Sequence, residues 1–347
     1  MAVIYVAGSA PGVGKTGFAT AIARSCIDKG QSVGIIKPLI ISPSSKTCSA
    51  VDEEVQYYKK IVPGNPDFLH RAINITDPPE IQQATLTDSI DAINATSRDY
   101  DTLIIEGLDG LDLTHRSTEI SMAVVAGTNA QVITLVNPND TLTTSTTTAS
   151  LNPFGDKQIG VIINQVPRYQ MRSIETDIRN AHGNSGYKIL GVLPEDRLML
   201  SPTVQQLANH LGASPLHTEY LRNQAEHTEA IVQYIMVGGW FLDKGSYVFS
   251  RRNNKAVIVR GDRPDSQMAA LETLTLCLIL TDGRYPVQYI TYQAEQHQVP
   301  MYLVEAPTVV TLESVEGINS RINSYNSRKT DHFMTLLQNH CDLSNIG

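Results

Sequence analysis

A short stretch near the start of the chain combines glycines with a lysine and a threonine in an order suited to binding phosphate. It reads Gly8-Ser9-Ala10-Pro11-Gly12-Val13-Gly14-Lys15-Thr16 and lies between an apolar run and a helix-forming run. Backbone N–H groups of such a turn point toward an anion, and the dipole of the following helix adds partial positive charge. Lys15 could then reach the β- and γ-phosphates of a nucleotide, and the Thr16 hydroxyl could ligate Mg²⁺. A purely structural turn is the alternative.

The first glycine of this stretch departs from the usual spacing of phosphate-binding loops. That spacing places a glycine five positions before Gly14, where this chain has Ser9, and Gly8 lies six positions before it. The Gly-Lys-Thr order between a strand and a helix still predicts nucleotide binding. The predicted contacts are Gly8, Gly12, Val13, Gly14, Lys15 and Thr16.

The elements that would position this stretch alternate between apolar, β-rich runs and longer helical patterns. Strands are predicted at residues 3–7, 33–36, 102–106, 131–136, 159–164 and 188–192, and helices at 15–29, 52–61 and 171–181. Nearly continuous apolar strands indicate a parallel sheet with helices on both faces. The predicted fold class is therefore α/β.

The alternation is interrupted near residues 211–215, which indicates a domain boundary. We expect one domain over residues 1–210 and a smaller α/β domain over 211–347. Strands of the second domain are predicted at 255–260, 276–281 and 301–305. A charged, amphipathic stretch at 311–343 closes the chain, and the second domain is expected to include a C-terminal helix. A length of 347 residues also favours two domains over one.

Three motifs of the first domain resemble one branch of the P-loop proteins, the dethiobiotin synthetases and cobyrinic acid a,c-diamide synthases. Their turn reads Gly-Thr-Asp-Thr-x-Val-Gly-Lys-Thr, and this chain matches it in register at Gly8, Val13, Gly14, Lys15 and Thr16. The segment 34–38, Gly-Ile-Ile-Lys-Pro, resembles the Lys-Pro step that closes their second strand, and Glu106-Gly107 resembles their Glu-Gly at a strand end. The early glycine is thus a mark of this branch.

The resemblance implies which side chains surround the metal and the phosphates. Asp52 stands where the family has an aspartate near magnesium, and hard oxygen ligands are what Mg²⁺ prefers. A metal site at Thr16, Asp52 and Glu106 is therefore expected, with Lys37 and Lys15 as catalytic residues that neutralise a transferred phosphoryl group. Asp52 and Glu106 could instead be helix-capping acids, and Lys37 a solvated strand end.

Two further residues are implied to lie at the base of an adenine nucleotide. Asn164 matches the family's asparagine that reads the adenine edge, since an amide offers both a donor and an acceptor. Pro194 belongs to a stretch that resembles the one lining the base. The expected cofactors are ATP and Mg²⁺, and a turn asparagine is the alternative for Asn164.

The chain as a whole resembles the N-terminal region of long phosphotransacetylases, where a dethiobiotin-synthetase-like domain precedes a small DRTGG domain. The segment 257–265 resembles the small domain's Gly-Asp-Arg-x-Asp signature, and 280–286 resembles its Leu-Thr-Gly-Gly-x-x-Pro signature with Asp282 replacing one glycine. These residues could bind a second ligand, an anion or a nucleotide, or could form an Asp–Arg turn or an oligomer contact. The candidates are Gly261, Asp262, Arg263, Asp265, Thr281 and Gly283.

Two functions follow from these resemblances. The first is an ATP- and Mg²⁺-binding regulatory or metabolite-sensing protein, with slow ATP hydrolysis and without acetyl transfer, because the phosphotransacetylase catalytic domain is absent from this sequence. The alternative is an ATP-dependent, carboxylate-activating synthetase or ligase. Regulation is favoured because Ser9, Ala10 and Pro11 replace polar residues of the synthetase turn, and the run 39–41 is apolar where the synthetases have small polar residues.

Composition excludes several other classes. The formal net charge is −8 and the chain has no dense basic run, which argues against nucleic-acid binding. No segment approaches the roughly twenty apolar residues of a membrane span, and scattered cysteines indicate neither a disulfide framework nor a zinc site. A soluble cytoplasmic protein is expected, with a small-molecule metabolite and a second copy of the chain as expected partners.

Overall fold

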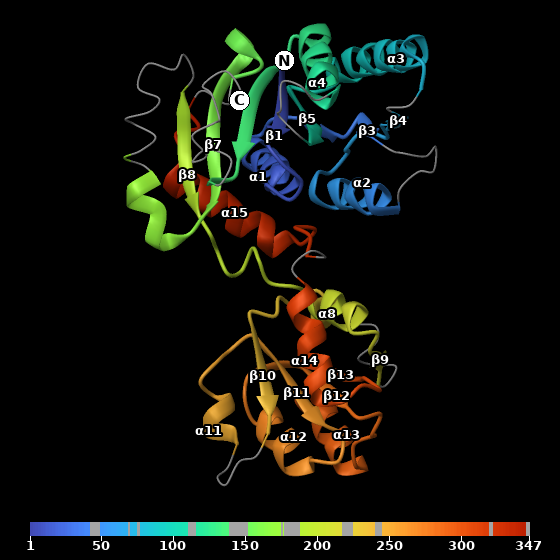
Figure 1. Ribbon diagram of the computed structural model, residues 1–347, viewed down its shortest axis with the longest axis vertical. Helices are drawn as coiled ribbons and strands as arrows, with labels where there is room; N and C mark the ends of the chain where they lie inside the picture. The colour runs from blue at the N-terminus through green and yellow to red at the C-terminus, as the bar shows by residue number, and fades with distance from the viewer. Residues whose placement is uncertain are drawn as a thin grey trace. The chain divides into compact units, whose positions relative to one another are not determined.

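A computed structural model shows how the chain folds (Figure 1). It describes all residues except 42–48, 69, 75–76, 110–115, 139–151, 175, 177–187, 217–224, 240–244, 319–321 and 345–347. The chain forms two compact units: residues 1–196 together with 324–347 make the first, and residues 197–323 make the second.

The first unit is built on a six-stranded parallel sheet in the order β2-β5-β1-β6-β7-β8 (Figure 1). Its strands are β1 (Ala2–Gly8), β2 (Val33–Ile36), β5 (Thr102–Asp109), β6 (Gln131–Val136), β7 (Gln158–Val166) and β8 (Ile189–Pro194). A separate parallel pair joins β3 (Leu39–Ile41) to β4 (Arg71–Ile73). The helices are α1 (Lys15–Asp28), α2 (Ser49–Ile61), α3 (Pro79–Ser97), α4 (Arg116–Thr128) and α15 (Ser327–His340).

Side chains along each strand point alternately to the two faces of this sheet, which explains why helices cover both faces. Tyr5 and Ile105 point to the face where Ile93 of α3 and Val124 of α4 complete a buried cluster. Neighbouring residues such as Ile104 therefore point to the opposite face, because successive side chains of a strand alternate. On that face α1 packs against β1, β2 and β5, and every residue named here is buried.

The C-terminal helix α15 belongs to the first unit. It packs along α1 and against β8, and the ring of Phe333 lies over Gly17, where an added Cβ would be 3.6 Å from the ring. Thr330 bonds to the hydroxyls of Tyr57 and Thr20, and both bonds are buried. The predicted domains, 1–210 and 211–347, assign this helix to the second domain, because α15 follows that domain in the sequence. In the structure the apolar face of α15 is instead buried on α1.

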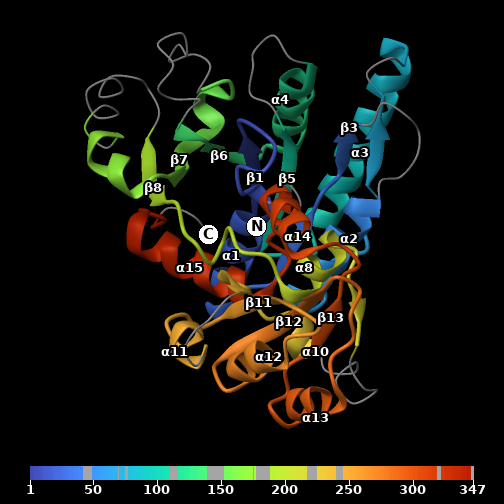
Figure 2. The ribbon, with the colours of Figure 1, turned by 60° about the horizontal axis from the view of Figure 1, so that its bottom comes forward.

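The second unit is a smaller, mixed α/β layer structure (Figure 2). Its sheet has the order β10-β11-β12-β13-β9, in which only the β13–β9 pair is antiparallel. The strands are β9 (Ser214–Pro215), β10 (Tyr234–Gly238), β11 (Lys255–Arg260), β12 (Thr275–Thr281) and β13 (Met301–Leu303). The helices are α8 (Val204–His210), α10 (Ala225–Thr228), α11 (Ser246–Phe249), α12 (Pro264–Leu271), α13 (Gln288–Gln296) and α14 (Thr308–Glu316).

Each face of the second sheet has its own buried cluster. Val257 and Leu278 face α12 and α13, whereas Ile258 and Ile279 face α8 and the segment that contains α14. None of the described helices has the length and apolar character that a membrane-spanning helix needs. The predicted fold class, a parallel α/β sheet followed by a smaller α/β domain, is confirmed.

Candidate functional site

The glycine-rich stretch connects the carboxyl end of β1 to the first turn of α1, as the sequence predicts. Gly12 has φ +76° and Gly14 has φ +102°, a region that L side chains rarely adopt, so glycine is required for the turn. Lys15 is the first residue of α1 and its side chain is buried. The turn therefore directs backbone N–H groups and a lysine to one place, where an anion would be stabilised.

The early glycine, Gly8, has a direct structural reason. A Cβ at this position would lie 2.8 Å from both Lys15 Cδ and Val13 Cγ1. The aliphatic stem of Lys15 thus passes over Gly8, and any larger residue would push it away. Ser9, the residue after β1, is held against β6 instead, since its N–H donates to the carbonyl of Leu135 at 2.9 Å.

Two amide side chains at the end of β7 hold the turn. Asn164 Nδ2 donates to the Val13 carbonyl at 2.8 Å, and Gln165 Nε2 donates to the Gly12 carbonyl at 2.8 Å. Asn164 Oδ1 accepts the backbone N–H of Gln165 at 2.9 Å. Both ends of the Asn164 amide are thus engaged with backbone, and its sequence-derived role at an adenine edge stays a prediction. Gln165 is not among the predicted contacts, because only its neighbour Asn164 matches the family motif.

Two buried carboxylates lie beside the start of α1. The Thr16 hydroxyl lies 3.0 Å from Glu106 Oε1 and 3.2 Å from Glu54 Oε1. Glu106 is on β5, next to β1 in the sheet, and Glu54 is on α2. These oxygens are hard ligands, so the three side chains fit Mg²⁺, which usually takes one or two carboxylates and completes its shell with waters and phosphates. Among the described residues, no cluster of three or more His, Cys, Asp or Glu side chains could bind a metal by itself.

Glu54 was not among the predicted ligands, which included Asp52 on the same helix. The Asp52 side chain lies outside the residues that the structure describes. The spacing of Glu54 in the sequence indicates that it faces the interior. It lies three and four residues before Tyr57 and Tyr58, so the three share one face of the helix, and both tyrosines are buried.

Lys37 forms ion pairs with both carboxylates. Its Nζ lies 2.6 Å from Glu54 Oε2 and 3.4 Å from Glu106 Oε1. Burial by itself lowers the pKa of Lys37, but the charges of Glu106 and Glu54 outweigh it and raise that pKa above its usual value. For Glu54, burial and the charge of Glu106 raise the carboxyl pKa, and Lys37 partly opposes the rise. The lysine is thus held charged next to the predicted metal ligands.

Tyrosines complete the surroundings of both carboxylates. The Tyr58 hydroxyl donates to Glu106 Oε2. Tyr325, a residue just before α15, bonds to Glu54 through its hydroxyl. Burial, and then the charge of Glu106, raises the pKa of Tyr58, so this phenol stays a donor. Gly107 allows the ring of Tyr5 to pack against β5, because an added Cβ would lie 2.4 Å from the ring. Tyr325 could not be predicted from local sequence.

Pro194 ends β8, next to the end of β7. It pairs with Val166 in the sheet, and the following residue, Glu195, donates its N–H to the Val166 carbonyl at 2.7 Å. The sheet therefore brings Pro194 to the same edge as Asn164. Its role in lining a base stays a prediction.

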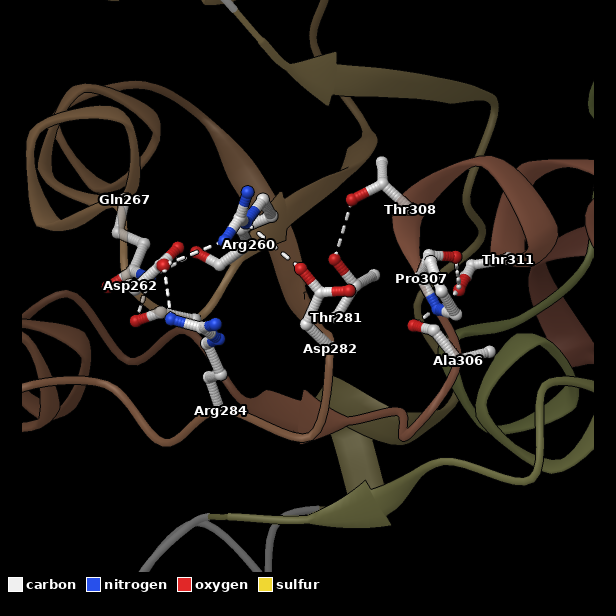
Figure 3. A network of polar contacts seen from close by, with 11 residues as sticks. Arg260, Asp262, Gln267, Thr281, Asp282, Arg284, Ala306, Pro307, Thr308 and Thr311 are labelled. Atoms are coloured by element: carbon white, nitrogen blue, oxygen red, sulfur yellow. Dashed lines mark hydrogen bonds and ion pairs between the residues drawn. The ribbon is translucent and has the colours of Figure 1, made fainter.

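The second predicted cluster lies at the carboxyl ends of β11 and β12 (Figure 3). Asp262 Oδ2 accepts from Arg260 at 2.8 Å and from Arg284 at 2.7 Å, while Arg260 also contacts Asp282 at 3.0 Å. Arg263 binds Asp265 through two hydrogen bonds of 3.0 and 2.8 Å, which keep the pKa of Asp265 below its usual value. The arginines of this cluster are thus paired with acids of the same unit.

Glycines allow the close approach of the loops that carry this cluster. A Cβ on Gly261 would lie 1.7 Å from the Arg284 carbonyl oxygen, and Gly283 has φ +61° beside the Glu305 carboxylate. The Thr281 hydroxyl bonds to Thr308 at 2.7 Å (Figure 3). The Asp–Arg turn that the sequence suggested as an alternative is therefore present, and a second ligand here stays a prediction.

The fold and the turn after β1 define a P-loop domain, which implies nucleotide binding, followed by a second α/β domain. Comparison with known families agrees: residues 2–203 match the family described as AAA domain, and residues 201–318 match the DRTGG domain. The chain belongs to this AAA domain family, of the dethiobiotin-synthetase-like P-loop type, and carries a DRTGG domain after it, as in the N-terminal region of phosphotransacetylases. The predicted resemblance is confirmed.

The solved structures to which this chain is similar are distant. The signal recognition particle receptor FtsY of Elizabethkingia anophelis, in complex with GDP, has 14% identity and a TM-score of 0.38, and the match covers 56% of this chain and 57% of that one. MinD of Aquifex aeolicus has 15% identity and a TM-score of 0.34, over 56% and 83% of the chains. The CBS and DRTGG domains of Clostridium perfringens pyrophosphatase, complexed with the activator diadenosine tetraphosphate, have 12% identity and a TM-score of 0.30, over 49% and 80%.

Proposed function

We propose that this protein is a regulatory or metabolite-sensing protein that binds ATP and Mg²⁺ and hydrolyses ATP slowly. One observation supports nucleotide and metal binding. The side chains at the start of α1 lie together, and they are those of Thr16, Glu54, Glu106 and Lys37. Thr16 and the two glutamates would hold the ion. Lys15 and Lys37 would face the negative charge of the phosphates.

Two described segments beside this site supply little chemistry for a carboxylate substrate. Residues 9–13 of the turn carry no ionisable side chain, and the Ser9 hydroxyl accepts the backbone N–H of Asn137 at 3.3 Å. After Lys37, Leu39 is buried and begins a strand that pairs with β4. In these two segments, polar groups that would orient a substrate are thus replaced by backbone pairing and apolar packing, which favours sensing over synthesis.

The DRTGG match supports a regulatory role for the second unit. In the Clostridium perfringens pyrophosphatase, the DRTGG domain belongs to a regulatory region. We propose that the second unit of this chain likewise reports the presence of a small-molecule metabolite, and that the chain acts as a homo-oligomer.

The test is a thermal-shift screen with Mg·ATP, Mg·ADP and Mg·GTP, followed by phosphate release. Lys15→Ala should abolish nucleotide-dependent stabilisation, whereas Lys29→Ala, an exposed position at the other end of α1, should retain it. Stabilisation by Mg·ATP with slow, substrate-independent phosphate release would support sensing. Release that requires a particular carboxylate would favour the synthetase alternative, and stabilisation that survives Lys15→Ala would contradict the site.

A further inference from the structure

Lys37 lies where a cation is expected between the two carboxylates of the proposed metal site. We infer that its ammonium group is an internal counter-ion that occupies this site in the nucleotide-free chain, and that Mg²⁺ must displace it, an exchange that is favourable when Lys37 can move to the phosphates of the nucleotide. The inference rests on the proposed function, since it concerns how the same site is controlled.

The electrostatics of the pair require a counter-ion. Glu106 is 2% exposed and Glu54 is 7% exposed, and both approach the Thr16 hydroxyl. That hydroxyl has one proton, so it cannot satisfy two carboxylates. Buried carboxylates without a compensating positive charge are strongly unfavourable.

The ammonium of Lys37 supplies this charge through short contacts. It lies 2.6 Å from Glu54 Oε2 and 3.4 Å from Glu106 Oε1, so it contacts the two side chains that would hold the metal. Lys37 follows the end of β2, a strand whose residues are all buried, while the lysine itself is only partly buried. Its backbone is therefore held by the sheet, and the flexible side chain can change partners.

Two cations cannot occupy this space together without repulsion. A divalent ion that binds the free chain must first displace Lys37, which would then lose both ion pairs and gain only solvent. With a nucleotide bound, the displaced ammonium gains phosphate oxygens as new partners, and the exchange becomes favourable. The site would thus discriminate against free Mg²⁺ and favour the nucleotide-bound metal.

The direct test measures metal binding without nucleotide. Mn²⁺, which has the same ligand preference, is titrated into the full chain and followed by the electron paramagnetic resonance signal of free Mn²⁺. Lys37→Met should bind Mn²⁺ roughly tenfold or more tightly than the parent chain, because about 1.4 kcal/mol of competition corresponds to tenfold. Lys29→Met should bind as the parent does. Equal Mn²⁺ affinity of Lys37→Met and the parent would overturn the inference.

The same variant should bind Mg·ATP less tightly than the parent, since it lacks the cation that faces the phosphates. A gain in affinity for the free metal, together with a loss in affinity for the metal–nucleotide complex, distinguishes this inference from a general loss of structure. If Mg·ATP fails to bind the parent chain, the proposed function fails, and the nucleotide-free Mn²⁺ titration still decides the role of Lys37.

A second measurement on the parent chain covers the case in which Lys37→Met does not fold. Amine acetylation followed by peptide mass spectrometry should modify Lys37 more slowly than Lys29 in the metal-free chain. Saturating Mn²⁺ should release Lys37 and accelerate its acetylation several-fold, while Lys29 stays constant. Mn²⁺ binding that leaves Lys37 acetylation unchanged would contradict the exchange.

Discussion

The side-chain amide of Asn164 donates a hydrogen bond of 2.8 Å to the carbonyl oxygen of Val13, so the end of β7 fixes the phosphate-binding turn. The contact is close, since a Cβ on Gly14 would lie 2.6 Å from Asn164 Nδ2. In the nucleotide-free chain this side chain supports the loop itself.

Asn164→Ala should therefore weaken binding of all ligands that carry the phosphate chain. We expect Mg·ATP and Mg·tripolyphosphate to lose affinity by a similar factor, roughly five- to tenfold, as for loss of one buried hydrogen bond. Isothermal titration of both ligands measures this. Loss of ATP affinity with unchanged tripolyphosphate affinity would show instead that Asn164 reads the base.

A second prediction concerns the glycine that departs from the usual spacing. Gly8→Ala should displace the Lys15 side chain, because the new methyl group would lie 2.8 Å from Lys15 Cδ. We expect nucleotide affinity to fall at least roughly tenfold, since the ammonium loses its place at the phosphates. Gly30→Ala is the matched control for a general glycine effect, because Gly30 has no atom within 4 Å of its Cβ position although its φ is positive. Equal nucleotide affinities of Gly8→Ala and the parent would contradict the packing argument.

A third prediction separates the two adjacent glutamates of α2. Glu54→Gln should lower the Mg²⁺ dependence of nucleotide binding, because it removes one of two carboxylates that contact Thr16 and Lys37. Glu53→Gln is a matched control, since Glu53 is exposed on the same helix. The measurement is ATP affinity with Mg²⁺ and with a chelator. If both variants keep the full Mg²⁺ effect, Glu54 is not a metal ligand.

The parts of this site that depend on contiguous sequence could be predicted. Gly12, Gly14 and Lys15 are close in the chain, and the conformation of the turn and the start of α1 follow from their types. The place of Glu106 in the site could also be predicted, because the carboxyl ends of parallel strands meet at one edge of the sheet.

The remaining contacts depend on tertiary packing. Glu54 faces the site because of the rotation of α2 about its axis, which the match at Asp52 did not specify. Tyr325 reaches Glu54 only because the chain returns to the first unit after residue 323. No local pattern encodes that return, which is why α15 was expected in the second domain.

A last prediction concerns Lys255, a fully buried lysine at the start of β11. Burial lowers its pKa to about 8, and its Nζ donates to the Leu274 carbonyl at 2.9 Å. In the unfolded chain the pKa of this lysine is about 10.4. Between these values the unfolded state binds more protons, so the free energy of unfolding rises with pH, whereas below about pH 8 the full cost of the buried charge is present.

Lys255→Met should remove this dependence. At pH 7 the variant should be more stable by about 1–3 kcal/mol, since a charge penalty of a few kcal/mol outweighs one lost hydrogen bond. Between pH 7.5 and about 9.5 the parent should gain stability with rising pH and the variant should not. Urea unfolding followed by the fluorescence of Trp240, the single tryptophan of the chain, measures both effects. Lys29→Met should follow the parent, and an unchanged pH slope in Lys255→Met would show that Lys255 is not the titrating group.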